Sequence, residues 1–213
     1  MPLILHKELQ PAGELGIWRI EEPEAWFRQK LELSRTEQQQ FEKLKGRRRV
    51  EWLAVRKLVH RMSGREKRGS FLKDEYGKPH LEDSPFDISI SHSANLAAAI
   101  AAPFSVGIDI QVIVAKIGRL APRYMRSEEL ESLKDDHRIE HMHVYWGAKE
   151  ALYKAYGRRE LDFCQNILIK PFPYDPRGGL IRGRIKLTKL ELHYEGRYER
   201  MDDYILVYAR ALE

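Results

Sequence analysis

Apolar residues occupy every second position over residues 106–111, and this segment constrains the fold more than any other. Val106, Ile108 and Ile110 alternate with a glycine, Asp109 and Gln111. This is the period of a strand with one apolar face. Asp109 and Gln111 are therefore expected to project from the same side of that strand.

Residues 137–156 show a helical period instead, because their apolar members fall on one arc at about 100° per residue. Lys149, Glu150 and Lys154 are expected on the opposite arc, with Glu150 and Lys154 one turn apart. A carboxylate between two ammonium groups suits a magnesium ion that bridges protein and polyphosphate, since Mg²⁺ takes oxygen ligands and lysines neutralise phosphate oxygens. Taken singly, each segment is equally an ordinary strand end or a solvated helix face.

Further blocks upstream make the pattern more specific. Taken in order with the strand and the helix, residues 48–56, 74–79 and 88–93 resemble the signature of the 4′-phosphopantetheinyl transferases, in particular the Sfp-type branch. The resemblance runs from about Arg48 to Gly157. It implies Mg²⁺-dependent transfer of the phosphopantetheine arm of coenzyme A to a serine of an acyl or peptidyl carrier protein, with release of 3′,5′-ADP. Such carriers serve fatty-acid, polyketide or nonribosomal peptide biosynthesis.

The same resemblance implies roles for particular residues. Asp109 and Glu150 would hold the metal, and Glu150, or a water that it orients, would accept the serine proton. Lys154 and Lys149 would hold the diphosphate. The expected contacts to coenzyme A are Arg48, Arg49, Lys73, Lys78, Ser91, His92, Lys149 and Lys154. Among these, Lys78 would touch the phosphates with Lys73 as a helper, and His92 would contact the 3′-phosphate together with an arginine of the 48–49 pair.

Two positions depart from the family pattern. Many Sfp-type enzymes have an acid where this chain has Gln111, which we include in the expected metal set because an amide oxygen can hold a metal-bound water. We expect retained activity with a raised magnesium requirement. The alternative is a catalytically weak protein of the same fold that binds coenzyme A or carrier domains. Gly147 lies inside the expected helix, where glycine costs about 1 kcal/mol relative to alanine, and the sequence offers no reason for it.

Strands and helices alternate in two rounds, residues 1–103 and 104–213, which predicts an α+β fold. The resemblance implies two pseudo-symmetric halves, each a small antiparallel sheet packed with helices. The first would supply the coenzyme A phosphate contacts and the second the metal and catalytic motif. Residues 47–62 are expected to form a largely buried helix with Arg49, Arg56 and His60 on its narrow polar face, and Ser127 is expected to cap a short helix. The other predicted elements are helices at 23–33 and 34–44 and strands at 16–20, 86–91, 96–102, 180–192 and 204–209.

Composition limits the setting and the partners. The chain has 213 residues, a net charge of +5 and one cysteine, Cys164, so a disulfide framework is excluded and a reducing cytoplasm is the natural setting. No stretch predicts a membrane span or a secretory signal. The positive charge points to an anionic partner, which coenzyme A and an acidic carrier protein satisfy. One chain with two halves would suffice, so we expect a monomer.

Other polar clusters receive plainer interpretations. The basic run at residues 47–49 could contact nucleic acid, but it opens a mostly buried helix and lacks stacking aromatics, so no nucleic-acid partner is expected. His137, His141 and His143 could bind a metal by residue type. His141 and His143 are predicted to face different sides of a helix, which favours solvent-facing or capping histidines instead.

Overall fold

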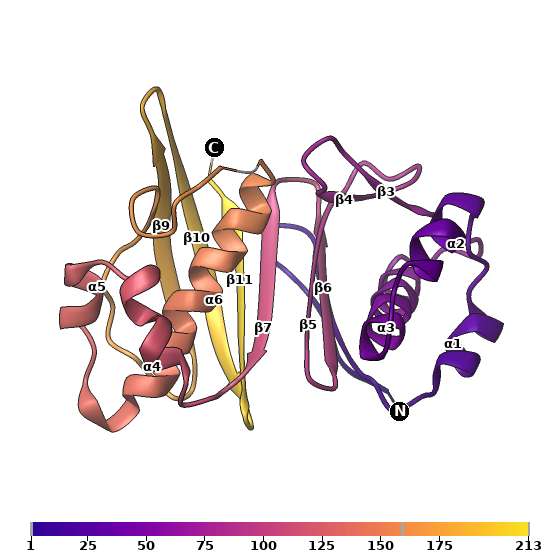
Figure 1. The fold of residues 1–213 in the computed structure, drawn as a ribbon. Helices are drawn as coiled ribbons and strands as arrows, with labels where there is room; N and C mark the ends of the chain where they lie inside the picture. Colours follow the sequence, from indigo (N-terminus) through magenta and orange to yellow (C-terminus); the bar gives the residue numbers. More distant parts are fainter. Residues whose placement is uncertain (1, 159, 213) are drawn as a thin grey trace. The chain divides into compact units, whose positions relative to one another are not determined.

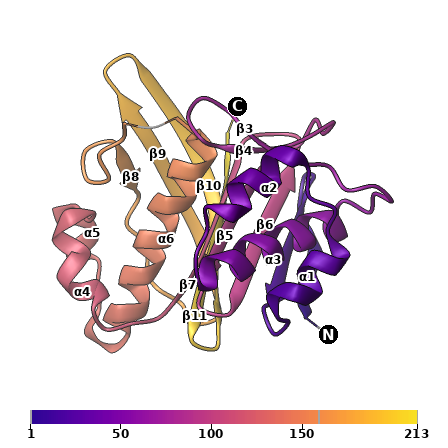
Figure 2. The same ribbon diagram turned by 45° about the vertical axis from the view of Figure 1, so that its right-hand side comes forward.

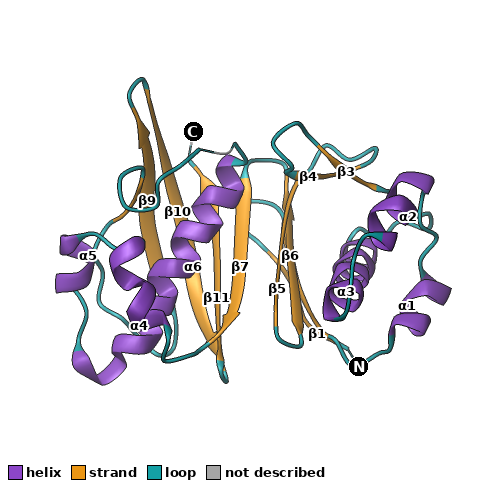
Figure 3. Cartoon of the chain, viewed as in Figure 1, coloured by secondary structure: helices purple, strands orange, loops and turns teal. Residues whose placement is uncertain are grey.

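The computed structural model describes residues 2–158 and 160–212, and the chain divides between Pro103 and Phe104 into two compact units. Each unit holds one antiparallel sheet with helices packed against it (Figure 1, Figure 3). The predicted α+β fold class is confirmed. Within the described ranges, none of the helices combines the length and the apolar character that crossing a membrane requires.

Unit 1 is built around a sheet in the order β1-β2-β6-β5-β4-β3. Its elements are β1 (Leu3–Glu8), β2 (Glu14–Arg19), α1 (Glu24–Lys30), α2 (Arg35–Glu42), α3 (Arg47–Met62), β3 (Phe71–Lys73), β4 (Pro79–Leu81), β5 (Asp87–Ser93) and β6 (Leu96–Ala102). The long helix α3 packs across β2, β5 and β6 and against α1. Its apolar residues form the core of this unit together with apolar residues of the sheet, α1 and α2.

The polar face that the sequence predicts for α3 is only partly exposed. Arg56 is buried, and its guanidinium donates to Glu37 Oε1 at 3.0 Å and stacks over the Trp52 ring. Glu37 is itself fully buried and also pairs with Arg68. Arg56 is thus a core residue of unit 1, contrary to the expected shared polar face.

Unit 2 is built around a sheet in the order β7-β11-β10-β9-β8. Its elements are β7 (Val106–Val112), α4 (Ile117–Leu120), η1 (Ala121–Arg123), α5 (Ser127–Glu131), η2 (Asp135–His137), α6 (Arg138–Tyr156), β8 (Ile167–Ile169), β9 (Gly179–Leu187), β10 (Leu190–Met201) and β11 (Tyr204–Ala211). Helix α6 runs along β7 and β11, with α4 and α5 beside it on the same side of the sheet (Figure 2). The predicted cap Ser127 is the first residue of α5; Arg126 is the cap, and its backbone N–H donates to Glu129 at 2.9 Å.

The two units repeat one topology. Leaving out β1, the order β2-β6-β5-β4-β3 matches β7-β11-β10-β9-β8, and a long helix, α3 or α6, covers the first strand in each. In each unit a glycine of the first strand fixes how the long helix is aligned with that strand. A Cβ on Gly16 of β2 would meet Leu58 and Met62, and a Cβ on Gly107 of β7 would meet the backbone of Ala151 and Ala155.

Candidate active site

The strand and helix that the sequence singles out lie in contact. A Cβ on Gly107 would lie 1.8 Å from the Ala151 carbonyl oxygen, so only glycine allows β7 and α6 to approach this closely. Asp109 follows two residues later and faces the helix. The sequence spacing therefore becomes a spatial pairing through backbone contact.

Asp109 and Lys154 form the central ion pair of this region. Lys154 Nζ donates to Asp109 Oδ1 at 2.8 Å and to the Ile108 carbonyl oxygen at 3.0 Å. The Asp109 side chain is 10% exposed and the Lys154 side chain 27%. The lysine thus joins helix to strand while part of its surface stays accessible.

Glu150 lies one helical turn before Lys154 and belongs to the same electrostatic group. Burial raises the pKa of Glu150, the Lys154 ammonium lowers it, and the Asp109 carboxylate raises it further. Two carboxylates that interact in this way, balanced by one ammonium, leave a negative site of oxygen donors. The donor set fits Mg²⁺, which prefers carboxylate oxygens completed by phosphate and water.

Gln111 takes a different position from the expected one. Its Nε2 donates to Asp109 Oδ2 at 3.0 Å and to the His143 carbonyl oxygen at 3.2 Å, while its Oε1 lies 2.7 Å from His143 Nδ1. The amide nitrogen therefore faces the carboxylate and the amide oxygen faces the histidine. This differs from the expected metal set, because the N–H group that faces Asp109 cannot bind a cation and the amide oxygen is turned toward His143.

Gly147 gains an explanation from the same contacts. A Cβ on this residue would lie 2.7 Å from Val207 Cγ2 and 3.1 Å from Gln111 Nε2. Helix α6 thus gives up a side chain at this position to leave room for β11 and for the Gln111 carboxamide. The energetic cost of a helical glycine is offset by this packing.

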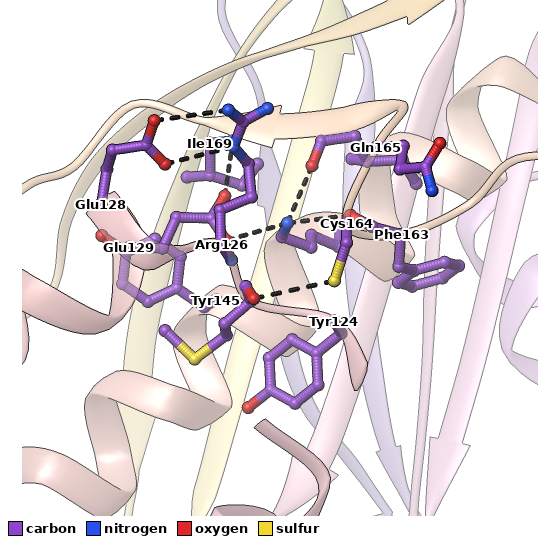
Figure 4. Close-up of polar contacts among 12 residues, drawn as sticks. Tyr124, Arg126, Glu128, Glu129, Tyr145, Phe163, Cys164, Gln165 and Ile169 are labelled. Atoms are coloured by element: carbon purple, nitrogen blue, oxygen red, sulfur yellow. Dashed lines mark hydrogen bonds and ion pairs between the residues drawn. The ribbon is translucent and has the colours of Figure 1, made fainter. Parts of the chain in front are cut away.

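Lys149 lies on another side of α6 and is fully buried. Its Nζ pairs with Glu129 Oε2 at 2.9 Å and donates to the carbonyl oxygens of Phe163 and Ile167 at 2.9 and 2.8 Å. Figure 4 shows Glu129 of this cluster beside Ile169, whose backbone N–H donates to it at 3.0 Å. Burial lowers the pKa of Lys149 against the raising effect of Glu129. This placement corrects the expected diphosphate contact, because the ammonium is enclosed and saturated by protein oxygens.

In unit 1, expected phosphate contacts lie in ion pairs. Lys78 Nζ lies 2.6 Å from Asp87 Oδ2. The exposed His92 lies 3.3 Å from Glu51. Arg47, which the resemblance did not single out, lies 3.3 Å from the same carboxylate and also donates to the Ala94 carbonyl oxygen.

The arginine pair at 48–49 is divided between different surroundings. Arg49 donates to both carboxylate oxygens of Glu24 at 2.7 Å and lies over the Phe41 ring, and the hydrogen bond to Glu24 raises the pKa of Arg49. Arg49 therefore links α3 to α1 and α2, which differs from the expected phosphate contact. Arg48 is exposed.

The remaining expected contacts differ in exposure. Lys73 is exposed, whereas Ser91 is buried.

The histidines of α6 are not solvent-facing. His141 and His143 are 1% and 2% exposed, so the expected reading is wrong for both, while His137 is the N-cap of α6. Across residues 2–158 and 160–212 no group of three or more His, Cys, Asp or Glu side chains is arranged to hold a metal. The contact of His143 with Gln111, at 2.7 Å between Nδ1 and Oε1, was not predicted. Gln111 lies on another element, and no spacing rule links the two.

Comparison with known proteins points to one family. Residues 105–209, from the start of β7 into β11, match the family model described as the 4′-phosphopantetheinyl transferase superfamily. A relative from Synechocystis sp., provisionally designated a 4′-phosphopantetheinyl transferase, is 34% identical over 92 residues. That match covers 38% of this chain, and the chain spans 37% of the relative's length. The family match thus falls on the unit that contains Asp109, Glu150 and Lys154.

Proposed function

We propose that the chain is a 4′-phosphopantetheinyl transferase of the Sfp type, which moves the phosphopantetheine arm of coenzyme A to a carrier-protein serine. One observation carries the proposal. Asp109, Glu150 and Lys154 converge between β7 and α6 inside the segment that matches the superfamily model. Carboxylate oxygens that can hold Mg²⁺, beside a partly exposed ammonium, form the kind of site that binds a diphosphate substrate.

The proposed reaction needs few protein groups. The serine oxygen attacks the phosphorus that bears the pantetheine arm, the bond to the bridging oxygen breaks, and 3′,5′-ADP leaves with that oxygen. Asp109 and Glu150 would hold Mg²⁺, which when bound supplies positive charge to the diphosphate oxygens. Lys154 would add fixed positive charge there.

Glu150 is the proposed acceptor of the serine proton, directly or through a water. Asp109 is held between Lys154 and Gln111 and is therefore the less suitable base.

Unit 1 is proposed to contribute contacts to coenzyme A phosphates. Lys78 and His92 remain the proposed contacts, and Arg47 joins them because it pairs with the same Glu51 carboxylate as His92. A phosphate group would compete with Asp87 and Glu51 for these cations. Arg48 and Lys73 are exposed and stay in the proposal as weaker contacts.

The test is a mass measurement on the acceptor. Apo forms of an acyl carrier protein and of a peptidyl carrier domain are incubated with the protein, coenzyme A and Mg²⁺, and then weighed. We expect a gain of one phosphopantetheine arm that depends on Mg²⁺ and is lost in Asp109→Ala and Glu150→Ala. No gain with either acceptor, or a gain that persists in both variants, would contradict the proposal.

A weak coenzyme A or carrier-binding protein is the second candidate, because Gln111 stands where a third acid is common in the resembling family. Calorimetry separates it from the first. Binding of coenzyme A by wild-type protein without any mass gain on the carrier would favour this second function.

A further inference from the structure

We infer that His143 is a positioning residue which, through the Gln111 carboxamide, fixes the Asp109 carboxylate in the orientation that binds the metal. The inference deepens the proposed function and depends on it for the identity of the site. It rests on a chain of contacts that runs from Val114 through His143 and Gln111 to Asp109. His143 contacts neither Asp109 nor Glu150 in these hydrogen bonds, so its role is indirect.

The direction of each hydrogen bond follows from groups that cannot change roles. Gln111 Nε2 lies 3.0 Å from Asp109 Oδ2 and 3.2 Å from the His143 carbonyl oxygen. A backbone carbonyl only accepts, and an ionised carboxylate only accepts. The amide group near them must therefore be the NH₂, and the flipped carboxamide is excluded.

The orientation of Gln111 in turn assigns the proton on His143. Gln111 Oε1 lies 2.7 Å from His143 Nδ1, and an oxygen that can only accept requires Nδ1 to carry hydrogen. The other ring nitrogen, Nε2, accepts from the Val114 backbone N–H at 3.0 Å. Burial lowers the pKa of His143, which favours this neutral form. Imidazolium would also donate from Nδ1, with Nε2 donating to the Val114 carbonyl oxygen at 3.2 Å. The direction of the contact with Gln111 is the same in both cases.

Packing holds the carboxamide in place. The missing side chain at Gly147 leaves a space in which Gln111 Nε2 lies, 3.1 Å from the position that a Cβ would occupy. His143 is 2% exposed, so water does not compete for its contact with Gln111. Asp109 is then gripped on both oxygens, Oδ1 by Lys154 and Oδ2 by Gln111. Its side-chain torsions are fixed before any substrate arrives.

This arrangement gives Gln111 a function that an acid at the same position would not serve. A carboxylate at 111 would repel Asp109 unless a cation lay between them. The carboxamide instead stabilises Asp109 by a charge-assisted hydrogen bond and leaves the metal to Asp109 and Glu150. Outer contacts of this kind typically contribute 10- to 100-fold to metal affinity.

The test compares two substitutions of similar size at position 143. In His143→Asn the side-chain NH₂ can take the place of Nδ1 and donate to Gln111. In His143→Gln the amide reaches the place of Nε2, near Val114, and leaves Gln111 Oε1 without a donor. Binding of Mn²⁺ to the protein without coenzyme A is measured by electron paramagnetic resonance, and the Mg²⁺ concentration for half-maximal transfer is measured separately.

We expect His143→Gln to weaken Mn²⁺ binding roughly tenfold and to raise the Mg²⁺ requirement by a similar factor. His143→Asn should stay within about twofold of wild type, since a merely structural role would not be rescued by restoring one donor. Thermal unfolding and circular dichroism confirm that each variant is folded. If His143→Gln does not fold, Gln111→Met takes its place and should show the same loss of Mn²⁺ affinity.

Clear outcomes would overturn the inference. Wild-type Mn²⁺ affinity in His143→Gln, or equal losses in His143→Asn and His143→Gln, would show that the Nδ1 contact does not position Asp109. Absence of Mn²⁺ binding by wild-type protein would also overturn it. Failure of the proposed function would give a different result. The carrier protein would not be modified, while the Mn²⁺ affinities of the variants would still show whether His143 positions Asp109.

Discussion

Both units contain the same buried arrangement around a glutamate, and the proposed site lies beside the arrangement of unit 2. In unit 1 Glu37, in the first turn of α2, accepts from the Phe71 backbone N–H of β3 at 3.1 Å. In unit 2 Glu129, in the first turn of α5, accepts from the Ile169 backbone N–H of β8 at 3.0 Å. Each glutamate therefore ties a short helix to the outermost strand of its sheet.

The long helices supply matching cations. Arg56 of α3 reaches Glu37 at 3.0 Å, and Lys149 of α6 reaches Glu129 at 2.9 Å. The glycine registers confirm that these residues correspond, because Gly16 meets Leu58 and Met62 where Gly107 meets Ala151 and Ala155. Arg56 and Lys149 therefore occupy equivalent positions and stabilise the fold of their units.

The neighbouring positions are where the units differ. In this register Glu150 corresponds to Lys57, Lys154 to Arg61, and Asp109 to the buried Trp18. Unit 1 has no carboxylate at the positions that form the site of unit 2. The comparison teaches that adjacent residues of one helix can have different roles. Lys149 stabilises the fold, whereas the neighbouring Glu150 belongs to the proposed site.

The largest expected effect tests this division by activity. Asp109→Asn should lower kcat/KM for carrier modification by about 10²- to 10³-fold, because it removes charge from the proposed metal site. Lys57→Ala and Arg61→Ala, at the corresponding positions of unit 1, are the matched controls and should stay within about twofold of wild type. Initial rates with an apo-carrier protein measure this. Comparable losses in the unit 1 variants would break the comparison.

The next effect is on stability. Lys149→Met should lower the free energy of unfolding by about 3–5 kcal/mol, because it leaves the Glu129 carboxylate buried without its cation. Arg56→Met should cost somewhat less, since Arg68 still pairs with Glu37. Urea unfolding measures both, with the exposed Lys186→Met as control at about 0.5 kcal/mol or less. A stable Lys149→Met protein with impaired coenzyme A binding would restore the phosphate role.

A pH effect belongs to unit 2. Burial lowers the pKa of His141 to about 4 from its ordinary value of 6.5, and its ring packs against Tyr145, Phe172 and Tyr174. The unfolded chain therefore binds a proton more readily than the folded chain between these values. The contribution of neutral His141 to the free energy of unfolding is complete well above pH 6.5 and is lost as the pH falls toward 4. At pH 5 the free energy of unfolding is expected to be about 2 kcal/mol lower than at pH 7.5.

The measurement is urea unfolding at pH 7.5 and pH 5. His141→Phe keeps an aromatic ring and removes the titrating group, so its loss of stability on acidification should be smaller by about that amount. An equal pH dependence in wild type and variant would show that His141 does not titrate in this way.

The smallest effect concerns unit 1. His92→Ala and Arg47→Ala should each raise the KM for coenzyme A about tenfold with little change in kcat, the pattern of lost ground-state binding. With 3′-dephospho-coenzyme A as substrate, the same variants should match wild type, because the proposed contact is absent. A similar loss with both substrates would argue against recognition of the 3′-phosphate.

The sequence predicted most elements with enough residues to show a period. It missed β1, and the predicted strand at 180–192 spans the turn between β9 and β10. The bounds of α3 and β6 match the predicted ones, because α3 shows a long helical period and β6 is a continuous run of small apolar residues. The strands β3, β4 and β8 have three residues each, which is too few for an alternation to show, and they were missed. Their pairing is decided by neighbouring strands and by buried partners such as Glu37 and Glu129, which lie far away in the sequence.

The proximity of Asp109, Glu150 and Lys154 was predictable, because alternation and the helical period fix which face each occupies. Their metal and catalytic roles stay a proposal. Lys149 was misplaced, because the helical period cannot tell which of two faces meets protein and which stays open. The role of His143 depends on a contact with Gln111 across two elements, for which a single sequence carries no signal.

Contact between main chains at Gly107 has a consequence for any attempt to re-engineer this centre. The distance between strand β7, which carries Asp109, and helix α6, which carries Glu150, is set by backbone atoms that are already in contact. The helix cannot move closer to the strand, and moving it away would lose this packing. If the proposed metal site is correct, a preference for a larger or smaller ion must be adjusted through the length and orientation of its side chains.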